Sequence, residues 1–515
     1  MTLTSVWRVK AKALSSEPTD RAPQRVVAGT THPLVDVAGT RALEAALQAT
    51  LPAHTLMQRA GAAVARLTLA LAPHAHNIWL ACGPGNNGGD GLEAAAQLQR
   101  LGKTAHVSWL GSPDTASADT RASWACAVES GVQWVQDCPS QAQFHIDALL
   151  GIGGVLRPPQ GRMLDLLRQL RSHRDTTLAI DVPTGLDADN GNVVDLETSV
   201  RAAHCLTLLT LKPGLFTGNG RDMATTVWLH DLGLDTLGHE ILLQHRCAEL
   251  LGARRCARAH ASHKGSYGDA VILGGAAGMS GAALLAGRAA LHAGAGRVYV
   301  ALSDGALPLD PAQPDLMLRL PPDGLRGACA VVGCGGGDTT AAVLPDALAQ
   351  AAQLVLDADA LNAIAADRGL NRLLQHRTAR KPDCTVLTPH PLEAARLLSI
   401  SVAEVQRDRC AAARTLACQT GCTVILKGSG SVVASMTGRI GINPTGNPRL
   451  AIAGTGDVLA GMVGAAMAQG LDSWDAACWA CYEHGATADR WSPNKSLTAS
   501  TLAESCRPLH AQHAS

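Results

Sequence analysis

The sequence predicts an α/β protein with two domains, each built on a largely parallel sheet. Short apolar runs alternate with longer helical stretches along most of the 515 residues, which is the pattern of βαβ units. Many of the apolar runs end in polar, glycine-rich turns, and open parallel sheets bind their ligands at those strand ends. The chain also exceeds one domain of ordinary size, because domains usually span roughly 100–200 residues.

The predicted elements fall into two sets, one in each half of the chain. Strands of the first half are Asn77–Ala81, His106–Leu110, Phe144–Leu149, Thr177–Ile180 and Cys205–Leu209. Strands of the second half are Ala270–Leu273, Arg297–Ala301, Ala330–Val332, Leu354–Leu356, Thr385–Leu387 and Thr423–Leu426. Ala-rich stretches predict helices over Leu92–Leu101, Ala282–Ala293 and Ala341–Ala352. The pattern breaks near residues 231–262, so we expect a loose leader over 1–30, a first domain over 31–236 and a second over 245–510.

Composition excludes several classes of protein. The 43 Lys and Arg balance 43 Asp and Glu, whereas a dedicated nucleic-acid binder carries a basic face. No secretory signal and no run of about 18 uncharged apolar residues is present, so we expect a cytoplasmic protein without membrane spans. The one C-x-x-C pair, Cys478 and Cys481, has no second pair with which to form a zinc site, and we expect buried reduced thiols.

Residues Gly83–Gly91 form the first glycine-rich turn, between a predicted strand and a predicted helix. Their G-x-G-x-x-G spacing suits an anion at a helix N-terminus. A simple dinucleotide-binding dehydrogenase also needs an acid at the end of the next strand, and Ser108–Gly111 contains none. The Asn and Asp side chains inside the turn favour a cation or a polar ligand instead.

Two further strand ends in this half carry acids. Asp147 is followed by a glycine turn, and Asp181 begins the stretch Asp181–Gly185. With the first turn, three strand ends carry oxygen-bearing side chains: Asn87 and Asp90, Asp147, and Asp181 and Thr184. Asn, Asp and Thr oxygens that meet at one edge of the sheet would make an oxygen-liganded cation site.

The motifs N-N-G-G-D-G, D-A-L-x-G and D-x-P-S/T-G resemble those of the NAD(P)H-hydrate epimerase domain, a Rossmann-like three-layer fold. The resemblance implies a potassium ion held by Asn87, Asp147 and Thr184. It implies that the hydrate is bound by Asn86, Asn87, Gly88, Gly89, Asp90, Gly151, Ile152, Gly153, Gly154, Val155, Leu156, Arg157 and Asp181. Either Asp90 or Asp181 is expected to be the acid/base group. The turn at Gly153 departs mildly from the family pattern.

The second half carries six glycine-containing turns in order, each at a predicted strand end. Lys427–Ser431 suits phosphate through charge, hydroxyls and amides, although it is not a P-loop. Gly454–Asp457 reads G-T-G-D at a helix start, which places an anion site beside one carboxylate.

These turns resemble the ribokinase-like superfamily and its ADP/ATP-dependent NAD(P)H-hydrate dehydratase branch, through H-K-G-x-x-G, G-x-G-x-G, D-A-D-A-L-N, T-P-H-P, K-G-x-x-[ST] and G-T-G-D-V-L-x-G. The resemblance implies hydrate contacts from Ala282, Gly335 or Gly337 of the 333–337 turn, His390 and Asp457. It implies nucleotide contacts from Lys427, Gly428, Ser429, Gly430, Ser431 and Gly456. ADP, with Mg²⁺, is the expected nucleotide and ATP the alternative, and Asp457 is the expected base.

Together the resemblances imply a bifunctional enzyme that repairs hydrated NADH and NADPH. The first domain would interconvert the R and S hydrates (NADHX and NADPHX), and the second would dehydrate the S form with consumption of ADP. Related enzymes suggest a homo-oligomer without a nucleic-acid or membrane partner. Two alternatives remain: a ribokinase-like kinase for a thiazole or pyrimidine alcohol, and a nucleotide sensor or binding scaffold. The T-P-H-P and H-K-G-x-x-G stretches favour the dehydratase.

Overall fold

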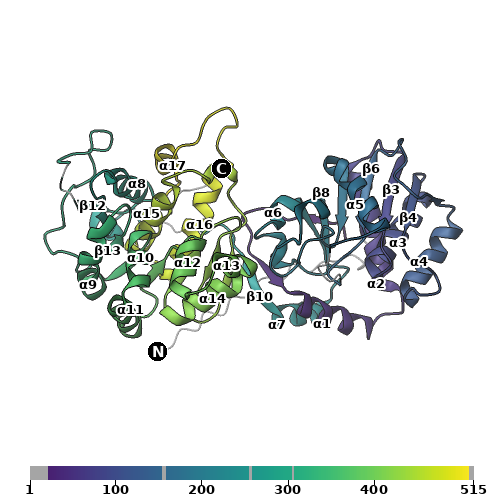
Figure 1. Ribbon diagram of the computed structural model, residues 1–515, viewed down its shortest axis with the longest axis horizontal. Coiled ribbons are helices and arrows are strands. Elements are labelled where there is room, and N and C mark those ends of the chain that lie inside the picture. Colours follow the sequence, from purple (N-terminus) through teal and green to yellow (C-terminus); the bar gives the residue numbers. More distant parts are fainter. Residues whose placement is uncertain (1–20, 154–157, 255–257, 304, 306, 510–515) are drawn as a thin grey trace.

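A computed structural model describes residues 21–153, 158–254, 258–303, 305 and 307–509 (Figure 1). The elements of the two halves form two bodies side by side, with β10 (Arg246–Leu250) between them (Figure 1). The calls on Gly154, Val155, Leu156 and Arg157, and most of the expected leader, lie outside the described residues.

The first sheet has eight strands, of which seven are parallel and the edge strand β1 runs antiparallel to its neighbour β9. Their spatial order is β1 (Gln24–Arg25), β9 (Ala224–His230), β8 (Ala202–Leu208), β7 (Thr177–Ile180), β6 (Phe144–Ala148), β3 (Asn77–Cys82), β4 (Thr104–Trp109) and β5 (Gln133–Trp134). The five strands predicted in this half are therefore present. The carboxyl ends of β3, β6 and β7 lie together at the centre of the sheet.

Helices cover both faces of this sheet, and the alternation of side chains along β3 shows how. On one face, Ile78 and Leu80 share a hydrophobic core with α1 (Val37–Gln48), α2 (Thr55–Leu71) and α3 (Asn86–Arg100). Trp79 and Ala81 are buried with α5 (Arg162–Ser172). Successive strand residues point to opposite faces, so the domain has the three layers expected.

The second sheet has ten strands, in the order β12-β11-β13-β14-β15-β16-β17-β18-β10-β2. Its parallel part is β12 (Arg297–Leu302), β11 (Asp269–Gly274), β13 (Cys329–Val332), β14 (Gln353–Leu356), β15 (Thr385–Leu387) and β16 (Thr423–Leu426). All six strands predicted in this half are among these. The antiparallel strands β17 (Val432–Ala434) and β18 (Ile440–Ile442) continue the sheet beyond β16.

This sheet is also covered on both faces, as a doubly wound α/β fold requires. One face packs against α8 (Ser280–His292), α15 (Thr455–Ala468), α16 (Ser473–Asp489) and α17 (Ala499–Ser505). The other packs against α9 (Thr340–Gln350), α10 (Asp359–Ala366), α11 (Arg368–Arg380), α12 (Pro391–Leu398) and α14 (Arg409–Thr420). The C-x-x-C cysteines Cys478 and Cys481 lie in α16, buried and free, as predicted. Among the described helices none is long and apolar enough to cross a membrane.

The chain crosses between the sheets where the sequence pattern breaks. Residues 231–262 contain α7 (Thr236–Gln244) and β10, and β10 joins the second sheet between β18 and β2 (His32–Val35). Of the described strands before residue 236, β2 is the one that lies in the second sheet rather than the first. The domain limits given above remain a prediction, and the pairing of β2 is a feature that local pattern does not encode.

Helix α3 begins at Asn86, six residues before the start predicted at Leu92. Gly85 caps it in an extended conformation, and the N-N-G-G-D-G residues form its first turns. The glycines allow close packing: a Cβ on Gly88 would lie 1.9 Å from the Gly83 carbonyl oxygen, and one on Gly91 would lie 2.6 Å from the Ala148 Cβ. Close packing inside the protein, against the backbone at Gly83 and against the Ala148 side chain, therefore requires glycine at both positions.

Candidate active sites

A cavity of about 440 Å³ opens at the carboxyl ends of the central strands of the first sheet. It brings together seven of the predicted binding residues: Asn86, Asn87, Asp90, Gly151, Ile152, Gly153 and Asp181. Gly88 and Gly89 are buried instead in the packing of α3, where a Cβ on Gly89 would lie 2.7 Å from side-chain atoms of Met57 and Thr120. The cavity is also lined by charged residues that the sequence motifs did not indicate: Arg41, Glu44, Asp119 and Lys212.

Asp181 lines this cavity in a backbone conformation that non-glycine residues rarely adopt. Its φ is +66°, a value that costs energy and is commonly found at functional sites. Lys212 Nζ donates to Asp181 Oδ1 over 2.5 Å, and the Ile152 amide donates to Oδ2 over 3.2 Å. The backbone at Ile152 and the buried lysine therefore fix the carboxylate against the cavity.

Lys212 is a candidate site residue that the sequence motifs did not indicate. Its side chain is fully buried, and Nζ also donates to Thr207 Oγ1 over 3.0 Å and to the Leu208 carbonyl over 2.8 Å. A buried lysine needs such a complete set of partners because an unpaired charge is costly to bury. The sequence feature that could have indicated Lys212 is its position in Leu211–Gly214, just beyond the strand that ends at Leu208.

Asp90 faces the same cavity from α3 in a different electrostatic environment. Burial, and then the nearby carboxylates of Asp181 and Glu44, raise the pKa of Asp90 well above its usual range. A carboxyl group with a raised pKa keeps its proton to a higher pH than an ordinary carboxyl group and can donate it. Asp90 is thus suited to act as the acid, while Asp181 is ion-paired with Lys212.

The predicted cation ligands lie beside this cavity. Burial raises the pKa of Asp147 to about 6, against hydrogen bonds from Thr184 and Leu149 that lower it. Thr184 donates to the Asp147 carboxylate through its amide and its hydroxyl, each over 2.8 Å. Both side-chain polar atoms of Asn87 are buried without a hydrogen-bond partner among the described residues. A desolvated carboxylate and an unsatisfied amide oxygen at neighbouring strand ends fit a cation with oxygen ligands such as potassium.

The second site begins where the 333–337 turn meets the start of α8. A Cβ on Gly335 would lie 2.9 Å from the Ala282 Cβ, and one on Gly337 would lie 3.5 Å from the Ala276 Cβ. Both glycines have positive φ, 58° and 54° respectively, which is the left-handed region that favours glycine. The structure therefore brings together the predicted substrate-binding residues Ala282, Gly335 and Gly337.

Asp457 lies in the first turn of α15, beside this glycine turn. The helix begins at Thr455 after Gly454, which has a φ of +92°, so the G-T-G-D motif does start a helix as predicted. One carboxylate oxygen each of Asp357 and Asp457 and the Cys334 Sγ lie within 4.8 Å of one another. Burial, and then the charge of Asp357, raise the pKa of Asp457 to about 6. A carboxylate with that pKa is mostly ionised at neutral pH and can accept a proton.

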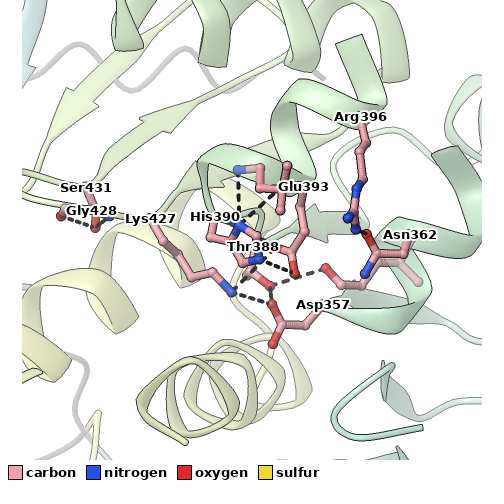
Figure 2. A network of polar contacts seen from close by, with 11 residues as sticks. Asp357, Asn362, Thr388, His390, Glu393, Arg396, Lys427, Gly428 and Ser431 are labelled. Atoms are coloured by element: carbon pink, nitrogen blue, oxygen red, sulfur yellow. Dashed lines mark hydrogen bonds and ion pairs between the residues drawn. The ribbon is translucent and has the colours of Figure 1, made fainter. Parts of the chain in front are cut away.

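Lys427 points into the protein and joins a polar network at the ends of β14, β15 and β16 (Figure 2). Its Nζ lies 2.8 Å from Asp357 Oδ1 and 3.9 Å from Glu393 Oε2. A Cβ on Gly456 would lie 3.3 Å from the same Nζ, so Lys427 also borders the start of α15. Asp357 and Glu393 were not predicted as site residues, although Asp357 belongs to the D-A-D-A-L-N motif and Glu393 follows T-P-H-P by two residues.

His390 lies between Lys427 and Glu393 in this network (Figure 2). Its side chain is 45% exposed, and its Nε2 lies 3.1 Å from Glu393 Oε1. Burial, and then nearby Lys427, lower the pKa of His390, so the ring is neutral at physiological pH. Its exposure leaves the ring accessible to a substrate, and its role as a hydrate contact stays a prediction.

The loop Gly428–Ser431 lies against the first half of the chain. Ser431 Oγ donates to the Gly428 carbonyl over 3.1 Å, which closes the loop on itself. Ser429 Oγ donates to the Gly218 carbonyl over 3.0 Å, and Thr217 Oγ1 donates to the Gly430 carbonyl over 3.2 Å. The predicted nucleotide loop is thus held by a turn that follows Lys212 in the chain.

Comparison with known proteins matches both halves. A family model described as YjeF-related protein N-terminus matches residues 53–214, and one described as NAD(P)H-hydrate dehydratase matches residues 270–508. The bifunctional NAD(P)H-hydrate repair enzyme Nnr of Escherichia coli K12 is 37% identical over 460 residues, 85% of each chain. The ADP-dependent (S)-NAD(P)H-hydrate dehydratase of Neisseria meningitidis is 42% identical over 262 residues, 49% of this chain and 86% of that one.

A solved structure, the ADP/ATP-dependent NAD(P)H-hydrate dehydratase of Bacillus subtilis co-crystallised with ATP and Mg²⁺, is 31% identical. It covers 49% of this chain and 92% of its own, with a TM-score of 0.42.

Two α/β domains that each gather carboxylates and glycine turns at their strand ends define an enzyme with two separate sites. The chain belongs to the family of bifunctional NAD(P)H-hydrate repair enzymes. The fold class and the two family resemblances drawn from the sequence are thereby confirmed. The roles of single residues remain predictions.

Proposed function

We propose that this chain repairs hydrated NADH and NADPH in two steps, one in each domain. The first domain interconverts the R and S hydrates, and the second dehydrates the S form with ADP as co-substrate. One observation carries this proposal. The chain belongs to this family and has two sites, one with the carboxyl group of Asp90 and the other with that of Asp457, whose pKa values are both raised by burial.

In the first site, Asp90 and Asp181 act on the carbon that bears the added hydroxyl. Asp90 gives or holds a proton, and Asp181, oriented by Lys212 and the Ile152 amide, acts as the partner base. Asn87, Asp147 and Thr184 would hold a potassium ion, which supplies positive charge beside the bound hydrate. The side-chain amide of Asn87, buried and without a hydrogen-bond partner among the residues that the structure describes, supports a ligand there.

In the second site, the chemical obstacle is that hydroxide is a poor leaving group. Asp457 takes the proton of the substrate hydroxyl, whose oxygen then attacks the terminal phosphorus of ADP while AMP leaves. The phosphate ester then leaves carbon, and loss of a proton from the neighbouring carbon forms the ring double bond. Amides at the start of α15 stabilise the developing phosphoryl charge. Mg²⁺, when bound with the nucleotide, supplies further positive charge on its phosphates.

The nucleotide is bound by Lys427–Ser431 and Gly456. The hydrate is bound by Ala282, the 333–337 turn and His390. Lys427 reaches the site with its charge already balanced by Asp357 and close to Glu393. We expect it to orient phosphate together with the loop amides rather than to act as a lone cation.

The discriminating experiment supplies the purified protein with pure S hydrate and ADP and follows the return of reduced-nicotinamide absorbance. The R hydrate should be repaired as well, after epimerisation. Absence of NADH formation, combined with phosphorylation of a thiazole or pyrimidine alcohol, would replace this proposal by the kinase. Absence of both reactions would favour a sensor or scaffold.

We also propose that the enzyme works in the cytoplasm as a homo-oligomer. All the described cysteines are free, which suits a reducing compartment. The oligomer rests on the family resemblance alone, and light scattering of the purified protein measures it directly.

A further inference from the structure

A cluster of one cysteine and two histidines lies at the edge of the first sheet where its parallel strands begin. His145 is the second residue of β6, His173 is the C-cap of α5, and Cys138 precedes β6 in the connecting loop. The candidate cavity of this domain opens at the opposite edge, where the strands end. The cluster therefore plays no part in the site already described.

One possible ligand atom from each of the three residues lies within 4.8 Å of the other two. Sulfur and imidazole nitrogen in this combination are typical of zinc and of metals with similar preferences, such as cobalt. The cluster contains no carboxylate, so it differs in kind from the oxygen-rich sites of both domains.

Hydrogen bonding indicates which nitrogen of His145 is available. Thr176 Oγ1 donates its proton to the His173 carbonyl over 3.1 Å, so it accepts from His145 Nδ1 at 2.9 Å. Nε2 of His145 then carries a lone pair rather than a proton. That atom is buried and has no hydrogen-bond partner among the described residues, and the whole residue is only 2% exposed. A buried acceptor without a partner calls for a ligand, and metal-bound histidines commonly donate their other nitrogen as His145 does here.

We propose that Cys138, His145 and His173 bind a divalent metal of the zinc type, with three protein ligands and a fourth position open to solvent. The ligands come from the loop before β6, from β6 itself and from the end of α5, so the metal would join three segments at the base of the sheet. Because binding to the folded chain alone stabilises it, a bound metal should raise the thermal stability of the protein.

Binding requires one side-chain movement that the structure permits. The rings of His145 and His173 are stacked, with centroids 4.1 Å apart and planes 9° from parallel. A metal binds each imidazole through a lone pair in the ring plane, so two stacked rings cannot share one ion without a rotation. His173 is exposed at the end of its helix and can rotate, whereas His145 is enclosed. The usual bond lengths place the ligand atoms of a tetrahedral zinc site roughly 3.3–3.8 Å apart. The three ligand atoms here lie within 4.8 Å of one another, so they also move closer together when the metal binds.

The test is a titration of the full-length, chelator-treated protein with Co²⁺ alone and then with Zn²⁺. We expect one equivalent of Co²⁺ with a tetrahedral spectrum and a thiolate-to-cobalt band, displaced by Zn²⁺. Cys138→Ser should remove the thiolate band, and His173→Ala should weaken binding at least about tenfold. His145→Gln, which keeps a polar group at the buried position, should also abolish tight binding.

Matched controls are Cys418→Ser and His376→Ala, which alter an exposed cysteine and an exposed histidine elsewhere. Both should bind Co²⁺ as the unaltered protein does. Failure to bind an equivalent of Co²⁺, or a thiolate band that persists in Cys138→Ser, would overturn the proposal. Because the site lies away from the cavity, hydrate epimerisation by Cys138→Ser should stay unchanged.

Discussion

The hydroxyl of Ser429 donates a hydrogen bond to the Gly218 carbonyl over 3.0 Å, which ties the proposed nucleotide loop to the first half of the chain. The Gly218 amide in turn donates to the Ser429 carbonyl over 3.2 Å. A Cβ on Gly430 would lie 2.0 Å from the Phe216 carbonyl oxygen, so the two backbones are in direct contact. Residues 212–218 thus connect Lys212, in the first site, with the loop of the second.

This contact predicts that the first domain helps to shape the nucleotide site. Thr217→Val keeps the volume of a fully buried side chain but removes its hydrogen bond to the Gly430 carbonyl. A lost hydrogen bond is worth about 0.5–1.5 kcal/mol, so the KM for ADP should rise roughly two- to tenfold. Steady-state kinetics of S-hydrate dehydration measures it. The exposed residue Thr115 supplies the control, Thr115→Val, and an unchanged KM in Thr217→Val would refute the coupling.

Asp457 is predicted to be the base of the dehydration step. Asp457→Asn keeps the shape of the side chain but removes its ability to accept a proton, so dehydration of the S hydrate should fall by about 10²–10⁴. Epimerisation, followed by chromatography of the two hydrates, should be unaffected. Glu504→Gln, a change of an exposed carboxylate in the same domain, is the control. Retained dehydration in Asp457→Asn would assign the base to another group.

The pH dependence of dehydration tests the same assignment independently. Burial and the charge of Asp357 raise the pKa of Asp457 to about 6. A base is active only when it is ionised, so activity should be level well above that pKa and be lost as the pH falls through it. Far below the pKa the rate should drop about tenfold for each pH unit. A rate that stays level from pH 8 to about 5, measured at saturating hydrate and ADP, would contradict the role.

Strand ends could be predicted from sequence because apolar runs that stop at Asp, Asn or Gly are a local signal. Asp147 and Asp181 were found in this way, whereas Asp457 was found from the G-T-G-D motif, which begins α15 rather than ending a strand. The early start of α3 could not be predicted, because its first turns contain glycines. Tertiary packing, such as that of Gly88 against Gly83, explains them. The pairing of β2 with β10 depends on the order of strands in the sheet, and the local sequence pattern does not indicate that order. Lys212 was missed because its importance depends on its ion pair with Asp181, and sequence alone does not show which carboxylate a lysine contacts.

The pair formed by Lys212 and Asp181 should therefore be tested for stability as well as activity. Lys212→Met leaves a largely buried carboxylate without its cation, and breaking such a pair costs about 3–5 kcal/mol. We expect the free energy of unfolding of the first domain to fall by that amount in urea, and epimerisation to be lost. The double variant Lys212→Met/Asp181→Asn should regain much of the stability but none of the activity. Equal losses in the single and double variants would show that the ion pair itself is unimportant.

Potassium should stabilise the first domain specifically. Asp147 is a buried carboxylate, and burial raises its pKa to about 6, so near neutral pH it is ionised in a position that disfavours its charge. A cation of matching size offsets that cost, and saturation at about 100 times the Kd adds about 2.7 kcal/mol of stability. At constant ionic strength, thermal unfolding should occur at a higher temperature in potassium chloride than in tetramethylammonium chloride. Asp147→Asn should abolish the difference, while Asp195→Asn, at an exposed carboxylate of the same domain, should preserve it. An identical unfolding temperature in both salts for the unaltered protein would exclude a potassium site at Asn87, Asp147 and Thr184.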